Sequence, residues 1–157
     1  MQSKLYAIAQ TILLILFGGI VFLAPRDYLF ISANSRVRAG LAVGGNILGG
    51  LGILMMVVAF LSLREVIQVA PEPKPGAHLV ETGIYKYLRH PIYTGIILCV
   101  IGLFLRTPTF WIGIASIAVI LFLFFKAGVE ERLLLEAYPG YAAYRRRTWG
   151  LFPGLRY

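Results

Sequence analysis

The residues most able to do chemistry lie in one short segment, Leu79 to Gly95. Its sequence, LVETGIYKYLRHPIYTG, places a guanidinium (Arg89) and an imidazole (His90) directly before an apolar stretch. Pro91 suits the first turn of a helix, because the N–H that proline lacks would have no partner there. The free N–H groups of such a turn favour an anion, so a carboxylate or a phosphate could bind at this point.

The same segment also carries three phenols, those of Tyr85, Tyr87 and Tyr93. Tyrosines and basic residues are common where a membrane helix meets water. An alternative interpretation is therefore an aromatic belt at a membrane surface, with Arg89 and His90 as simple interface markers. Residue types alone do not decide between the two.

A second polar segment is Lys126 to Arg132, with the sequence KAGVEER. Lys126 and Glu130 are four residues apart and share one helix face, where they can pair or bind opposite charges on one ligand. Glu131 points in another direction. Carboxylates beside a bilayer are costly without partners, which favours a zwitterionic or cationic ligand. The alternative is a helix end with ordinary solvated charges.

The composition indicates which solvent surrounds these segments. The 157 residues are 59% hydrophobic and 14% charged, with a mean hydropathy of +0.78. Soluble domains are about 45–50% apolar, so a bilayer is the expected environment. The single cysteine, Cys99, allows no intramolecular disulfide and no cysteine cluster, and no metal site is predicted. In a membrane protein the net charge of +8 indicates topology rather than nucleic-acid binding.

Four apolar segments are long enough to consider as helices. Spanning about 30 Å of hydrocarbon takes roughly 20 residues. The first two segments reach that length, and the last two are separated by Arg106-Thr107-Pro108, which predicts a tight helical hairpin. Glycines at four- and five-residue spacings in the second segment predict a packed central helix. The four segments are Leu5–Ala24, Ala39–Leu63, Ile92–Leu105 and Thr109–Phe125.

The polar stretches complete the predicted fold. Arg64–Pro91 is expected to be a loop, because prolines at its centre (residues 71–76) resist a regular helix. Glu130–Tyr144, followed by three arginines, is expected to form an amphipathic helix at the interface. We therefore predict an all-α, integral membrane bundle of about four transmembrane helices with an amphipathic C-terminal helix. It forms one domain, 1–157, with two helices in 1–63 and the functional half in 64–157.

The basic residues predict the orientation. Eleven of the 15 Lys and Arg residues fall on one side if the N-terminus, the 64–91 loop and the C-terminal region lie together. By the positive-inside rule this side is cytoplasmic, which gives a multi-pass protein with both termini in the cytoplasm. The two polar segments that carry the chemistry share that face.

Taken together, the motifs resemble those of a known family. The sequence reads G-x-Y-x-x-x-R-H-P-x-Y-x-G from Gly83, about 35 residues later E-E-x-x-L from Glu130, and then Y-x-x-Y and a proline near the end. This joint pattern resembles the isoprenylcysteine carboxyl methyltransferase family, which is related to phospholipid N-methyltransferases, and it covers about half of the chain. The resemblance implies that S-adenosylmethionine binds between the two segments. The residues that it implies for cofactor binding are His78, Leu79, Val80, Tyr85, His90, Pro91, Tyr93 and Glu130.

The resemblance also implies the roles of the remaining site residues. Arg89 and Glu131 would order the constellation and, with His90, form the catalytic set. Lys126 stands where the prenylcysteine enzymes carry an arginine that contacts the acceptor, and it is the predicted substrate-binding residue. Lysine keeps the charge but lacks the planar fork of arginine that suits a carboxylate.

Methyl transfer asks little of the protein, because the sulfonium methyl group is already electrophilic and alignment in a water-poor pocket supplies most of the catalysis. The predicted function is methylation of a hydrophobic or lipid-anchored acceptor. An amine or phenol acceptor must lose a proton, for which His90 or Glu131 are candidate bases. Two alternatives stay open: an NADPH-dependent membrane sterol or steroid reductase, which also has an R-H-P-x-Y element, and a non-catalytic membrane scaffold that binds anionic lipid.

Overall fold

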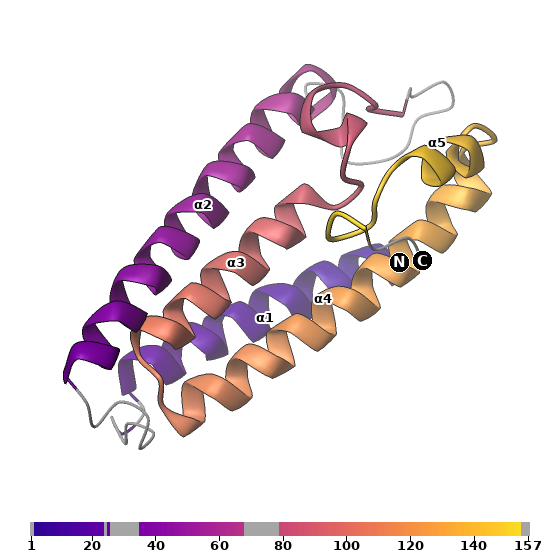
Figure 1. Cartoon of the computed structure of the whole chain (residues 1–157). Coiled ribbons are helices and arrows are strands. Elements are labelled where there is room, and N and C mark those ends of the chain that lie inside the picture. The colour runs from indigo at the N-terminus through magenta and orange to yellow at the C-terminus, as the bar shows by residue number, and fades with distance from the viewer. Residues whose placement is uncertain (1, 24, 26–34, 68–78, 155–157) are drawn as a thin grey trace.

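Four long helices carry most of the protein (Figure 1). The computed structural model describes residues 2–23, 25, 35–67 and 79–154. A short 3₁₀ helix, η2, precedes α3, and a short helix, α5, follows α4. The elements are α1 (Gln2–Leu23), α2 (Ser35–Ile67), η2 (Gly83–Lys86), α3 (Pro91–Arg106), α4 (Phe110–Ala137) and α5 (Tyr141–Arg147). Across these described ranges there is no β-strand, only an isolated bridge between Leu88 and Trp149. The predicted all-α class is confirmed.

The helices associate in two pairs, α2 with α3 and α1 with α4 (Figure 1). Small residues bring α2 and α3 close together. A Cβ atom placed on Gly102 would lie 2.5 Å from the carbonyl oxygen of Gly45, and one on Gly52 would lie 2.5 Å from that of Gly95. No side chain fits at that distance, so the glycines are required for this approach.

The prediction that α2 is a central helix is wrong. Only 11% of its most apolar stretch is buried, against 39% for α4, and it lies at one side of the bundle. The reason is that α2 packs closely against α3 along one face only. At Gly40, Gly44 and Gly50 an added Cβ would meet nothing.

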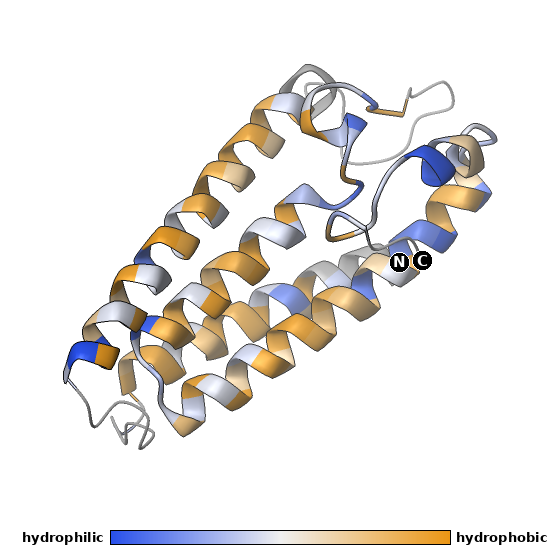
Figure 2. Ribbon diagram, viewed as in Figure 1, coloured by the Kyte–Doolittle hydropathy of each residue, from blue (hydrophilic) through white to orange (hydrophobic). Residues whose placement is uncertain are grey.

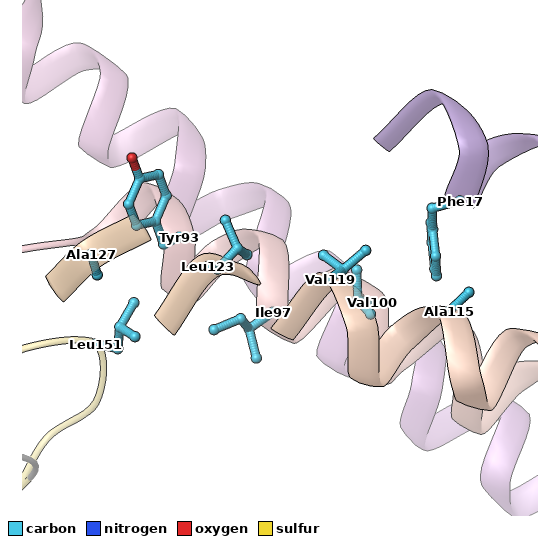
Figure 3. Packing of buried hydrophobic residues seen from close by; sticks show 9 residues of the cluster. All are labelled: Phe17, Tyr93, Ile97, Val100, Ala115, Val119, Leu123, Ala127 and Leu151. Atoms are coloured by element: carbon cyan, nitrogen blue, oxygen red, sulfur yellow. The ribbon is translucent and has the colours of Figure 1, made fainter. Parts of the chain in front are cut away.

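The apolar core lies between α3 and α4, as Figure 3 shows. Ile97 from α3 and Val119 and Leu123 from α4 are each 1% exposed. Phe17 of α1 joins this core near one end, and Leu151, from the segment after α5, closes it near the other. The core therefore fixes α3 against α4 and ties the C-terminal segment to both.

Two described helices are long and apolar enough to cross a membrane, over residues 35–63 and 110–137. Shorter apolar stretches are Ile8–Leu23 and Pro91–Arg106. Figure 2 shows apolar residues along the lengths of the helices and polar residues gathered at α5 and the adjacent part of α4. Large apolar side chains such as Ile47, Leu61 and Leu121 are exposed, as expected for a bundle surrounded by lipid.

The predicted break between the last two helices is confirmed. α3 ends at Arg106 and α4 begins at Phe110. The hydroxyl of Thr109 accepts a hydrogen bond from the backbone N–H of Ile112 at 3.3 Å, which caps the start of α4.

The predicted start of a separate helix at Glu130 is wrong. α4 continues without interruption to Ala137, and the chain turns only at Pro139-Gly140 before α5. A single glycine, Gly128, does not end a helix that packing supports on both sides. As a result Glu130 and Glu131 stand on the rigid final turns of α4. The proline-rich core of the predicted 64–91 loop lies outside the described residues.

Candidate functional site

The segment before α3 is held in place by the segment after α5. The backbone N–H of Arg89 donates to the carbonyl of Trp149 at 2.9 Å, and the N–H of Trp149 donates to the carbonyl of Tyr87 at 2.9 Å. Pro91 occupies the first turn of α3, as predicted, and Thr94 in the next turn donates its hydroxyl proton to the carbonyl of Leu151. Two regions some sixty residues apart in sequence therefore form one rigid unit.

Arg89 and Glu131 form a buried ion pair at the centre of this unit. The Nε of Arg89 lies 2.7 Å from Oε1 of Glu131, and the two side chains are 1% and 3% exposed. The Nη1 of Arg89 also donates to the carbonyl oxygens of Arg145 (3.0 Å) and Thr148 (2.7 Å). The second carboxylate oxygen of Glu131 lies 3.2 Å from Nε of Arg145. A buried pair depends on such additional polar contacts, and Oε2 of Glu131 has the ion-pair contact with Arg145 but no hydrogen-bond partner among the described residues.

His90 connects the two glutamates. Its Nε2 lies 3.2 Å from Oε1 of Glu131, and its Nδ1 lies 3.9 Å from Oε2 of Glu130. The imidazole stacks on the ring of Tyr93, with centroids 5.4 Å apart and planes only 3° from parallel. Because Glu131 is an acceptor, the arrangement favours the tautomer with the proton on Nε2 and the lone pair on Nδ1.

Glu130 forms a second polar cluster with residues of three helices. The hydroxyl of Tyr93 donates to Oε1 of Glu130 at 2.6 Å, and Nζ of Lys126 lies 3.4 Å from the same oxygen. Lys126 also lies over the ring of Tyr93, 5.1 Å from its centroid, and donates to Oε1 of Gln10 in α1 at 2.5 Å. The Glu130 side chain remains 36% exposed, unlike that of Glu131.

A cavity of about 250 Å³ opens beside these side chains. It contains apolar groups from α2, α3 and α4 beside the polar groups of the site. Its lining residues are Leu63, Tyr85, Arg89, His90, Ile92, Tyr93, Glu130 and Leu134. One glutamate, one histidine, one arginine and two tyrosines thus line a space that is otherwise apolar.

The structure brings together most of the predicted site residues. Of the predicted residues, Leu79, Val80, Pro91, Lys126 and Glu131 do not line the cavity. His78 lies outside the described residues. The predicted convergence of the Arg89-His90 segment with the acidic pair is confirmed by the short distances between them. The roles of the individual residues stay predictions.

Several residues that support the site were not predicted. Tyr144 of α5 donates its hydroxyl proton to the carbonyl of Tyr85 at 2.7 Å, and burial raises the pKa of Tyr144 to about 12. Burial also raises the pKa of Tyr85. Thr148 and Gln10 contact Arg89 and Lys126, respectively. Gln10 and Thr148 belong to none of the motifs, so only their position in the folded chain identifies them.

Within the described part of the chain, no group of three or more His, Cys, Asp and Glu residues is arranged to hold a metal ion.

Comparison with known proteins identifies the family of the chain. The model of the phospholipid methyltransferase family matches residues 41–140, which include most of α2 and all of η2, α3 and α4. The chain belongs to the phospholipid methyltransferase family. This agrees with the resemblance that the motifs suggested.

A curated relative is similar over part of the chain. The cobalt-zinc-cadmium resistance protein CzcN of Cupriavidus metallidurans is 37% identical over 79 residues, which are 49% of this chain and 36% of that protein. The chain thus matches about a third of the length of this relative. No solved structure matches the chain.

Proposed function

We propose that the protein is an S-adenosylmethionine-dependent methyltransferase that acts on a hydrophobic or lipid-anchored acceptor at the cytoplasmic face of a membrane. The observation that carries the proposal is the cavity at which His90, Tyr93 and Glu130 meet. Family membership supports methyl transfer over the NADPH-dependent reductase considered above. The enrichment of basic residues on the side of the site supports the cytoplasmic orientation.

The residues of the cavity suit this cofactor. Glu130 offers a partly exposed carboxylate to a cationic group, and the aromatic ring of Tyr85 suits a sulfonium. Small-molecule pockets commonly measure about 300–1,000 Å³, so a cavity of 250 Å³ fits one end of the cofactor rather than all of it. When bound, S-adenosylmethionine supplies an electrophilic methyl group.

The geometry suggests different roles for the two glutamates. Glu131 is 3% exposed, lies beside Arg89, Arg145 and His90, and does not line the cavity, so its carboxylate is engaged within the protein. We assign it, with Arg89, to positioning the segment that precedes α3. Glu130 is exposed to the cavity and is the residue that we assign to cofactor binding.

His90 is the best placed base for an acceptor that must lose a proton. It lines the cavity, and its Nε2–H is oriented by Glu131. That leaves the Nδ1 lone pair to accept a proton, at 3.9 Å from the nearest oxygen of Glu130. Apolar side chains of Leu63, Ile92 and Leu134 line the rest of the cavity and would exclude water from the reacting groups.

Calorimetric titration with S-adenosylmethionine tests the proposal. The purified protein should bind it, and His90→Ala and Glu130→Ala should each weaken binding at least tenfold, equivalent to about 1.4 kcal/mol. Glu136→Gln, at an exposed position of α4 outside the cavity, is the matched control and should bind as the wild type does. Incubation with radiolabelled cofactor and membrane extract should transfer label to a lipid-soluble product. Binding of NADPH in place of S-adenosylmethionine would refute the assignment.

A further inference from the structure

α1 contributes one polar side chain to the polar cluster around Glu130. Gln10 lies in the apolar run AIAQTILLILF, and its Oε1 accepts a hydrogen bond of 2.5 Å from Nζ of Lys126 on α4. The two residues are 116 positions apart. An amide inside an apolar helix is costly unless it has a partner, so this contact is a reason for a glutamine at this position.

Lys126 in turn acts on the site through its neighbours. It is 8% exposed and does not line the cavity. Its Nζ is 3.4 Å from Oε1 of Glu130, the same oxygen that accepts from Tyr93 at 2.6 Å, and it lies over the Tyr93 ring. The position of the ammonium group thus influences both the Glu130 carboxylate and the orientation of the Tyr93 phenol.

An ammonium group has three N–H donors and a flexible four-carbon chain. Nζ of Lys126 forms an ion pair with Glu130 on the same helix, and it donates a hydrogen bond to Gln10 on the paired helix α1. Without the Gln10 amide, Nζ of Lys126 would keep its ion pair with Glu130 and could move more freely around that carboxylate. The carboxylate of Glu130, already 36% exposed, would lose a fixed counter-charge.

We propose that Gln10 is a positioning residue of the site: through Lys126 it fixes the carboxylate of Glu130. α1 lies outside the residues that match the family, 41–140, yet on this proposal it belongs to the functional unit rather than serving only as an anchor. The effect on cofactor affinity rests on the proposed function, because it assumes that Glu130 contacts S-adenosylmethionine. The contact between Gln10 and Lys126 does not.

The test compares two substitutions at the same position. Gln10→Leu keeps the bulk and removes the acceptor, and Gln10→Glu keeps an acceptor oxygen toward Nζ. Gln10→Leu should weaken S-adenosylmethionine binding about threefold, which corresponds to the roughly 0.6 kcal/mol average of interhelical hydrogen bonds in bilayers. Gln10→Glu should stay within twofold of wild type. Ile12→Ala, on a 52% exposed side chain of the same helix, is the control and should change nothing.

A second measurement separates this inference from the function. Thermal unfolding without cofactor is followed for Gln10→Leu, Lys126→Met and the double variant. Because Gln10 acts through Lys126, Gln10→Leu should cause no further loss in the double variant, which should unfold at the temperature of Lys126→Met or above it, since leucine removes the amide left without its partner. A wild type that binds no S-adenosylmethionine refutes the proposed function, and the thermal cycle still tests the contact. Additive unfolding shifts, or equal loss of binding in the Leu and Glu variants, would overturn the inference.

Discussion

Arg89→Lys is the substitution that tests the central ion pair most directly. Arginine uses Nε for Glu131 and Nη1 for the carbonyl oxygens of Arg145 and Thr148. Lysine has a single nitrogen, which cannot reach all three acceptors at once. Two hydrogen bonds from a charged donor are lost, at about 1.5 kcal/mol each, so the free energy of unfolding should fall by about 3 kcal/mol.

Thermal unfolding in detergent measures this loss. For a chain of this size a change of 1 kcal/mol shifts the unfolding midpoint by roughly 2–4 °C, so Arg89→Lys should lower it by about 6–12 °C. The control is Arg147→Lys. Arg147 pairs with Glu81 at the surface, where it is 60% exposed, and such pairs contribute at most about 1 kcal/mol.

Two results of comparing Arg89→Lys with Arg147→Lys would contradict this prediction. If Arg89→Lys unfolded within about 2 °C of the wild type, the backbone contacts of Arg89 would not support the C-terminal segment, and the reasoning would fail. An equal shift in both variants would point to a general sensitivity to loss of arginine instead.

Three further predictions concern packing and ionisation. Tyr144→Phe should destabilise by about 1 kcal/mol in chemical denaturation because it loses a hydrogen bond, whereas Tyr141→Phe should have little effect, since that buried hydroxyl has no hydrogen-bond partner in the described chain. Burial raises the pKa of Tyr144 to about 12, above roughly 10 when unfolded, so its stabilisation should persist below pH 10 and be lost as pH rises through 12. Because the chain has nine tyrosines, the titration of Tyr144 is taken as the difference in phenolate absorbance between wild type and Tyr144→Phe, and a midpoint near 10 in that difference would contradict this. Gly102→Ala should cost about 1–3 kcal/mol through collision with Gly45, with Gly44→Ala, which meets open space, as the unaffected control in the same unfolding assay.

The sequence was informative where local chemistry decides structure. Pro91 and the Arg106-Thr107-Pro108 break could be located because proline restricts where a helix can begin or continue. The approach of Arg89 to Glu131 could also be predicted, because charges next to apolar helices require partners and the joint motif brings these two residues into one site.

Other features depend on contacts that no local pattern contains. The glycines of α2 indicate that another helix packs closely against it, but not how many helices surround it. The place of α2 at the side of the bundle could therefore not be predicted. The charged residues from Glu130 predict a separate helix, yet α4 continues to Ala137, because Ala127 and Glu131 are buried on either side of Gly128. Gln10 and Thr148 enter the site only through contacts with residues far away in the sequence, Lys126 and Arg89.

The pairing of Arg89 with the segment after α5 has a consequence for how the protein is made. Residues 148–151 leave the ribosome after all four long helices, yet they supply carbonyl groups to Arg89, His90 and Thr94. A nascent chain halted before Thr148 would hold its membrane helices together while Arg89 lacked these acceptors. Assembly of the pocket is therefore a late event in biosynthesis, separated in time from insertion of the bundle.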